Sequence, residues 1–337
     1  MLVRDDPSTE QVSTLLELGL EGVERTPAIQ ESVRLDRNTY RAWSVRPSMG
    51  SVVSVVVLHS SCAEAEDAIE AAFREMSRLV RILDRHDSAA PVAHLNAVGV
   101  LRDAPPELTE VVGRALRYHQ LTRGAFDVTV KPLVDLLRAT AGEPAPTERA
   151  EAAELVGAER LRLSGRRLSF DRSGMGITLD GIAKGYVVDR MAGMLSRHGV
   201  RRFLINAGGD IRASGGKQDG RPWMIGVRDP KSPDALCGVV SIRDGAIATS
   251  GNYEKPFAHI VDARTGRSAR TSLGVSVSAP EAMAADALAT ALFVLGPVAG
   301  CGLARSLAEC ECLIVDEAGR SASSPGWRSE RAKAGEA

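Results

Sequence analysis

Asp286 and Thr290 are oxygen-bearing side chains spaced four residues apart in an apolar stretch that runs from Ala285 to Phe293. The spacing predicts that both lie on one face of an amphipathic helix. A carboxylate and a hydroxyl on one face are hard oxygen donors that suit a Mg²⁺ ion, which can also hold substrate phosphates. The alternative is structural, with an aspartate near a helix start and a threonine that bonds back to its own helix. This segment alone does not decide between the two, because short motifs recur by chance.

A second candidate lies between Asp180 and Tyr186, where small residues cover the expected junction of a short strand with a helix. Backbone amides at a helix start can bind a phosphate, and Lys184 would add a positive charge. The alternative is a solvated lysine in the first turn of the helix.

The glycine-rich segment from Asn206 to Lys217 does not match either common phosphate-binding motif. Ile211 stands where the first glycine of a P-loop belongs, and Gln218 replaces its serine or threonine. The order of strand, turn and helix for a dinucleotide fingerprint is also missing. The segment is therefore either a turn between strands or a place where backbone closely approaches a ligand.

His259 follows a hydroxyl-rich loop around Thr249 and Ser250 and is predicted to begin a short strand. In that position it could act as a general base, although a lone histidine can equally be structural. Phe126 and Asp127 follow Gly124 after a predicted helix. Alone, they indicate a core aromatic and a turn or cap residue.

These residues need a scaffold, and the hydrophobic periodicity predicts several helices among strands of mixed spacing. We expect helices from about residues 61 and 106, after residue 180 to His198, and over 282–295 and 297–308. Expected strands cover residues 40–45, 51–58, 161–163, 167–170, 177–179, 203–206, 223–227, 239–242, 259–261, 275–278 and 312–315. This mixture indicates an α+β or mixed α/β fold rather than a regular βαβ series.

The same patterns divide the chain into three parts. Residues 1–38 are predicted to be a polar N-terminal extension with a possible short helix over 12–23. Residues 39–318 form one domain, and the small, polar residues 319–337 are expected to be a disordered C-terminal tail.

Composition limits the classes of partner. An aromatic content of 4% and a net charge of -1 without a basic stripe argue against a nucleic-acid-binding surface. We find no leader pattern and no run near the roughly 18–20 apolar residues that span a bilayer, so we expect no membrane insertion and a cytoplasmic location. The five cysteines lack the spacing of a zinc site, which favours free buried or surface thiols.

Taken in order, the segments resemble the FAD:protein FMN transferases, the ApbE-type flavin transferases. The resemblance covers about residues 40–316. It rests on seven ordered motifs: Met49-Gly50, Gly124 to Thr129, Gly181 to Asp189, Asn206 to Asp210, Thr249 to Tyr253, His259 to Gly266, and the Asp286/Thr290 helix.

The resemblance implies a T-fold-like flavin transferase domain over residues 39–318, with mixed sheets flanked by helices. The implied activity is Mg²⁺-dependent transfer of FMN from FAD onto a Thr or Ser hydroxyl of an acceptor protein, with release of AMP. Such a hydroxyl is a poor nucleophile that benefits from a base, and Mg²⁺ offsets the charge of the pyrophosphate.

Carried over residue by residue, the resemblance makes the side chains of Asp286 and Thr290 and the backbone carbonyl of Gly181 the Mg²⁺ ligands. His259 would be the base near the acceptor hydroxyl. The FAD site would be lined by Met49, Ala125, Phe126, Asp127, Thr178, Lys184 and Val261.

The chain departs from the family pattern at three positions. His86 stands where an aromatic residue is common, Thr178 where a carboxylate is common, and Ser51 where a threonine is usual. Two other functions stay open at this point: hydrolysis of FAD to FMN and AMP at the same site, and FAD binding without catalysis.

Overall fold

A nine-stranded antiparallel sheet forms the centre of the protein. The computed structural model describes residues 2–3, 29–251 and 260–330. Among them, the sheet order is β17 (Ser321–Ser323), β16 (Glu311–Val315), β15 (Gly274–Ala279), β12 (Gly245–Gly251), β9 (Asp210–Ser214), β8 (Arg202–Ala207), β4 (Ser51–His59), β3 (Thr39–Ser48) and β2 (Ile29–Asp36). Every neighbouring pair in it is antiparallel, as in the α+β form of the predicted fold class.

A smaller sheet covers part of one face of the large sheet. Its strands are β1 (Leu2–Val3), β10 (Trp223–Asp229), β11 (Ser232–Ile242) and β18 (Ser329–Glu330). Buried side chains of the two sheets, including Trp43, Ile247, Trp223 and Ile225, form one apolar cluster between them. Burial of these side chains holds the sheets together.

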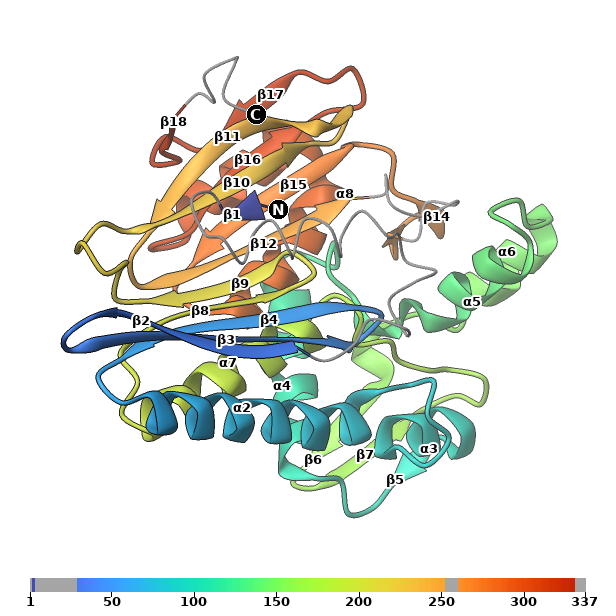
Figure 1. Ribbon diagram of the computed structural model, residues 1–337. Helices are drawn as coiled ribbons and strands as arrows, with labels where there is room; N and C mark the ends of the chain where they lie inside the picture. Colours follow the sequence, from blue (N-terminus) through green and yellow to red (C-terminus); the bar gives the residue numbers. More distant parts are fainter. Residues whose placement is uncertain (1, 4–28, 252–259, 331–337) are drawn as a thin grey trace.

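The opposite face of the large sheet is covered by helices. The principal ones are α2 (Cys62–Leu83), α7 (Ala183–Arg197) and α8 (Ala282–Ser306). In Figure 1, α2 and α7 run below the sheet formed by β2, β3, β4 and β8, while α8 lies behind β12 and β15. The largest buried cluster lies on this side and includes Phe73, Leu195 and Phe293.

The remaining elements lie mainly between α2 and α7 in the sequence. The helices are α3 (Pro91–Val98), α4 (Pro106–Leu121), α5 (Lys131–Ala139) and α6 (Pro146–Ala153), with 3₁₀ turns η2 (Val128–Val130) and η3 (Ala158–Arg160). Strand β5 (Val100–Leu101) joins the predicted hairpin of β6 (Leu161–Ser164) and β7 (Arg167–Phe170), and β13 (Val261–Asp262) pairs with β14 (Arg267–Ser268).

Helix α8 is two helical segments joined at a kink. Gly296 has a left-handed φ of 74°, and Pro297 follows it. Proline removes a backbone donor and cannot continue the preceding helix without distortion. The hydroxyl of Thr271 donates to the carbonyls of Phe293 and Val294 just before the kink. The two helices expected over residues 282–295 and 297–308 are therefore both present.

Three expectations about the chain need correction. Residues 29–36 are not part of an extension, because β2 pairs with β3 along its length. Residues 319–337 are not wholly a tail, because β17 pairs with β16 and β18 with β11. Residues 177–179 form no strand, since the Ile177 backbone bonds the Asn96 side chain instead of a neighbouring strand. The helix expected over residues 12–23 lies outside the described residues.

The expectation that no segment is long and apolar enough to cross a membrane is also wrong. Helix α8, with 25 residues, passes that test by length and composition, and 61% of its most apolar window is buried inside the protein. It packs on α7, β12, β15 and β16. A core helix surrounded by protein has an apolar composition for the same reason as a membrane span, because neither meets water.

The cysteines are free thiols, as expected. Cys301, Cys310 and Cys312 are buried, while Cys62 and Cys237 are partly exposed. The sulfurs of Cys301 on α8 and Cys312 on β16 lie 3.8 Å apart. Burial raises the pKa of the Cys312 thiol to about 12, so it behaves as a small apolar side chain.

Candidate active site

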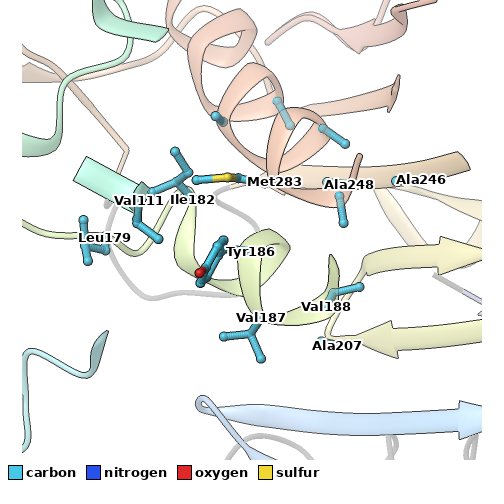
Figure 2. Close-up of a cluster of buried hydrophobic side chains, with 14 of the residues drawn as sticks. Val111, Leu179, Ile182, Tyr186, Val187, Val188, Ala207, Ala246, Ala248 and Met283 are labelled. Atoms are coloured by element: carbon cyan, nitrogen blue, oxygen red, sulfur yellow. The ribbon is translucent and has the colours of Figure 1, made fainter. Parts of the chain in front are cut away.

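The site begins where the N-terminal ends of α7 and α8 touch. A Cβ atom on Gly185 would lie 2.3 Å from the carbonyl oxygen of Ala282 and 2.7 Å from Cα of Met283. Only glycine permits this backbone contact. Figure 2 shows Ile182 and Met283 among the buried side chains at this junction. The Asp189 carboxylate accepts hydrogen bonds from the amides of Ala282 and Met283, both at 2.9 Å, and so caps the start of α8.

The contact between the helices places Asp286 in the protein interior. Asp286 is only 5% exposed to solvent. Its Oδ2 accepts a hydrogen bond from the Gly185 amide at 3.1 Å. Burial raises the pKa of Asp286 well above its usual value, and the nearby carboxylate of Asp210 raises it further. A carboxylate in such surroundings is stabilised in its charged form by a bound cation.

Lys184 supplies positive charge, but it is shared between the carboxylates. Its Nζ lies 3.0 Å from Oδ2 of Asp210. Asp210 is buried as well, and burial raises its pKa despite the lysine. Lys184 also lowers the pKa of Asp286, whereas Asp180 raises it. The group of Asp180, Lys184, Asp210 and Asp286 therefore contains three acids and one lysine.

Thr290 lies one turn beyond Asp286 and meets two other segments. Its hydroxyl is 3.3 Å from the Ser250 hydroxyl at the end of β12. Gly181 is so close that a Cβ there would lie 2.8 Å from Thr290 Oγ1. The structure thus brings together the three predicted metal ligands, Gly181, Asp286 and Thr290, around the junction of α7, α8 and β12.

These donors fit a Mg²⁺ ion. They are one carboxylate, two hydroxyls and the backbone at Gly181, all hard oxygen groups, and the local excess of acid favours a cation. No group of three or more His, Cys, Asp or Glu side chains is placed to hold a metal within the described part of the chain. Mg²⁺ keeps several waters and is commonly held by one or two carboxylates together with substrate phosphates. The small donor set is consistent with that behaviour.

Two residues predicted to line the FAD site, Ala125 and Phe126, have their side chains in the core. They are 2% and 3% exposed. The Phe126 ring packs edge-on against Tyr118 with 6.2 Å between centroids, and its amide donates to the Thr122 hydroxyl at 3.0 Å. A ligand at this segment could therefore meet only their backbone.

Asp127 is a cap residue in this structure, as one of its two interpretations predicts. Its Oδ1 accepts from the amide of Thr129 at 2.7 Å and from its hydroxyl at 2.6 Å. Its Oδ2 lies 3.3 Å from Nδ1 of His119 at the end of α4. The neighbouring Asp127 carboxylate raises the pKa of His119.

The other predicted flavin residues lie on separate segments. Met49 is half-buried in the turn between β3 and β4, with a left-handed φ of 54°. The Thr178 hydroxyl accepts from the Asp180 amide at 3.3 Å, and its own amide donates to the Val128 carbonyl at 2.8 Å. Val261 is buried in a cluster with Leu133. His259, the predicted base, lies outside the described residues.

The structure adds residues to which the sequence assigned no role. Asp210 pairs with Lys184, Ser250 meets Thr290, and Asp189 holds the start of α8. All three lie inside motifs on which the family resemblance rests, and this was the only signal in the sequence that pointed to them. Their contacts join elements that are distant in the chain, so spacing could not reveal them.

Comparison with known proteins identifies the family. The family model described as the ApbE family matches residues 49–314. The FAD:protein FMN transferase of Vibrio cholerae is 34% identical over 248 residues, which cover 69% of this chain and 71% of that protein. Its counterpart of the same name in Haemophilus influenzae is 29% identical over 252 residues, 69% of this chain and 73% of that one.

Solved structures agree with this match. The flavin transferase ApbE from Vibrio cholerae superposes with a TM-score of 0.76 at 26% identity and covers 89% of this chain and 97% of its own. The apo form of the Pseudomonas stutzeri flavinyl transferase ApbE gives 0.77 at 26% identity, with 87% and 97% covered. The predicted ApbE-type α+β fold is therefore confirmed, and the chain belongs to the ApbE family.

Proposed function

We propose that this protein is an FAD:protein FMN transferase that moves FMN from FAD to a Thr or Ser hydroxyl of an acceptor protein, with Mg²⁺ bound and AMP released. The relatives are named FAD:protein FMN transferases, a name that covers the transfer of FMN from FAD to a protein. The observation that carries the proposal is the buried Asp286 carboxylate, which lies one helical turn from Thr290, where the Thr290 hydroxyl meets Ser250 and Gly181. A buried acid with so few protein partners suits a site that is completed by a cation and an anionic substrate.

In the proposed reaction, the acceptor hydroxyl oxygen attacks the phosphorus on the FMN side of the FAD pyrophosphate. The new bond is a phosphoester, and the bond that breaks joins this phosphorus to the bridging oxygen of AMP. The hydroxyl proton passes to a base, which the family resemblance assigns to His259. AMP leaves with the electron pair of the broken bond.

The described residues would bind and orient the pyrophosphate. Asp286, Thr290 and the carbonyl of Gly181 would hold Mg²⁺, which when bound neutralises phosphate charge and polarises the phosphorus. The positive end of the α7 helix dipole also lies at this junction and favours an anion. Lys184 lies on the first turn of α7, where its ammonium could contact a phosphate while it remains near Asp210.

The deciding experiment separates transfer from hydrolysis. The protein is incubated with FAD and MgCl₂, with and without an acceptor domain encoded by a neighbouring gene. Covalent flavin is read by in-gel fluorescence, and AMP is read by chromatography. We expect fluorescent acceptor and equimolar AMP. AMP and free FMN with no labelled acceptor would support a pyrophosphatase, and unchanged FAD would support a non-catalytic FAD-binding protein.

A matched pair of variants tests the metal assignment. Asp286→Ala should abolish both products, because it removes the only carboxylate of the proposed ligand set. Asp171→Ala is the control, since it removes an exposed carboxylate that pairs with Arg162 on the surface. Full AMP release by the Asp286 variant would refute the metal assignment.

A further inference from the structure

Arg85 is a buried cation next to the site, and the proposed reaction does not use it directly. It follows α2 by two residues, and its side chain is only 4% exposed. Its Nη1 donates to Oδ1 of Asp135 on α5 at 3.0 Å. Its Nη2 and Nε donate to the two oxygens of Asp180 at 3.2 and 3.4 Å. Two-point contacts of this kind fix a carboxylate in both distance and direction.

Asp180 belongs to a segment that has no strand to hold it. The Asn96 amide group bonds the carbonyl and the amide of Ile177 at 2.9 and 2.7 Å. The Thr178 amide donates to the Val128 carbonyl at 2.8 Å. Arg85 then holds the segment at Asp180, directly before Gly181. Two side chains and one backbone carbonyl from other segments thus provide the hydrogen bonds that a neighbouring strand would otherwise provide.

The position of Gly181 matters because it lies against Thr290. A Cβ on Gly181 would come within 2.8 Å of Thr290 Oγ1. A small displacement of the segment at Asp180 would therefore separate the two groups that are proposed to bind the same cation.

We propose that Arg85 is a positioning residue for the cation site: acting through Asp180, it holds Gly181 against Thr290. The inference rests on the proposed function in one respect, since it takes Gly181, Asp286 and Thr290 as the cation site. Arg85 itself touches neither the cation nor the reacting atoms.

A role of Arg85 in positioning and a role in charge balance predict opposite changes in cation affinity when its guanidinium is removed. Asp180 is one of three acids near the site, and Arg85 offsets its charge. If charge alone mattered, removal of the guanidinium would make the site more negative and would tighten cation binding. If Arg85 positions Gly181, its removal loosens cation binding even though the site becomes more negative.

The test measures Mn²⁺ binding by electron paramagnetic resonance, with and without FAD, and needs no turnover. We expect Arg85→Gln to weaken binding about 10-fold or more, the size typical for loss of a group that orients a metal ligand. Arg85→Lys should recover part of the loss. Asp180→Asn should weaken Mn²⁺ binding similarly. The double variant should bind Mn²⁺ no more weakly than the single variant with the lower affinity. Unchanged or tighter binding in Arg85→Gln, or losses that multiply in the double variant, would overturn the proposal.

Variants of the two partners of Arg85 keep the test decisive. The Asp180 side chain is 57% exposed, so Asp180→Glu, which keeps the charge but changes the geometry of the contact, tests the same link even if Arg85→Gln does not fold. It should also weaken Mn²⁺ binding, whereas charge alone predicts no change. Asp135→Asn is the matched control, because it removes the other partner of Arg85 and leaves the contact with Asp180. It should bind Mn²⁺ within about 2-fold of wild type, and a loss as large as that of Arg85→Gln would point to general packing and refute the proposal.

The outcomes also separate this inference from the proposed function. Wild-type protein that binds no Mn²⁺ under either condition would overturn the metal site and the role of Arg85 together. Wild-type binding that Arg85→Gln retains in full would overturn the role of Arg85 alone.

Discussion

At the scale of single residues, the chemistry of the site has a cost in stability. Asp286 is buried, and both burial and Asp210 raise its pKa. Because its folded-state pKa lies above the unfolded-state value of about 4, ionisation is harder in the folded protein than in the unfolded one. The free energy of unfolding without metal therefore falls as the pH rises from about 4 through the folded-state pKa.

Replacement of Asp286 by Asn should remove that cost. In chelator at pH 7, we expect Asp286→Asn to be more stable than wild type, with a melting temperature higher by a few degrees, since about 1 kcal/mol corresponds to roughly 2–4 °C for proteins of 150–250 residues. The same variant should lose at least ~100-fold in the rate of AMP release. Denaturant titrations should show the stability difference narrowing toward pH 4. A variant less stable than wild type at pH 7 would contradict this account of the buried charge.

His119 also makes the protein less stable as the pH rises, but here it is the charged form of the side chain that is stabilised in the folded protein. The Asp127 carboxylate, 3.3 Å from its Nδ1, raises the pKa of His119. The stabilisation is therefore fully present below the unfolded-state pKa of about 6.5 and is lost as pH rises through the folded-state value. We expect His119→Gln to lower the free energy of unfolding by about 1 kcal/mol at pH 6 and by little at pH 9. Exposed His94 provides the control, and His94→Gln should show no such difference. An equal loss at both pH values would show that only packing is affected.

At the scale of elements, the crossing of α7 and α8 depends on Gly185. A methyl group there would meet backbone atoms of Ala282 and Met283, which cannot rotate away. Gly185→Ala should therefore separate the helices and destabilise the protein by about 1–3 kcal/mol. It should also reduce activity, because the Gly185 amide bonds Asp286.

Gly193 on the same helix is the matched control. A Cβ there would have its nearest neighbour at 3.9 Å, on the flexible Arg197 side chain. Gly193→Ala should stabilise the protein slightly, by up to about 1 kcal/mol, because alanine favours a helix. Chemical denaturation of both variants checks the pair. Equal effects at the two positions would show that the helix crossing does not require glycine.

The elements also show what sequence patterns can and cannot reveal. The Asp286/Thr290 pair could be predicted because a helix brings residues four apart together, whatever surrounds it. The break between the helices over residues 282–295 and 297–308 could be predicted for a similar local reason, because proline cannot continue a preceding helix. Strand β2 was missed because residues 30–34 are all exposed, so no alternation marks them. Contacts such as Lys184 with Asp210, or Arg85 with Asp180, depend on the tertiary arrangement and leave no periodic trace.

At the scale of the whole molecule, metal and flavin should stabilise the fold together. Acidic side chains and pyrophosphate are both anionic, and a cation between them favours the binding of each. A ligand at 100 times its Kd adds about 2.7 kcal/mol to the stability of the folded state. We expect FAD with Mg²⁺ to raise the melting temperature by more than the sum of the separate shifts. In Asp286→Asn this excess should vanish, and a purely additive wild-type response would contradict a shared site.

The distribution of the site along the chain has a consequence for biosynthesis. Gly181 and Lys184 precede Asp286 and Thr290 by about a hundred positions, and α8 packs between α7 and strand β16, which follows it. A domain of this kind folds as a unit. A polypeptide still attached to the ribosome before α8 emerges would contain Lys184 and Asp210 but not Asp286 and Thr290. We therefore expect nascent chains to capture flavin only after α8 and β16 have been synthesised and can pack against α7.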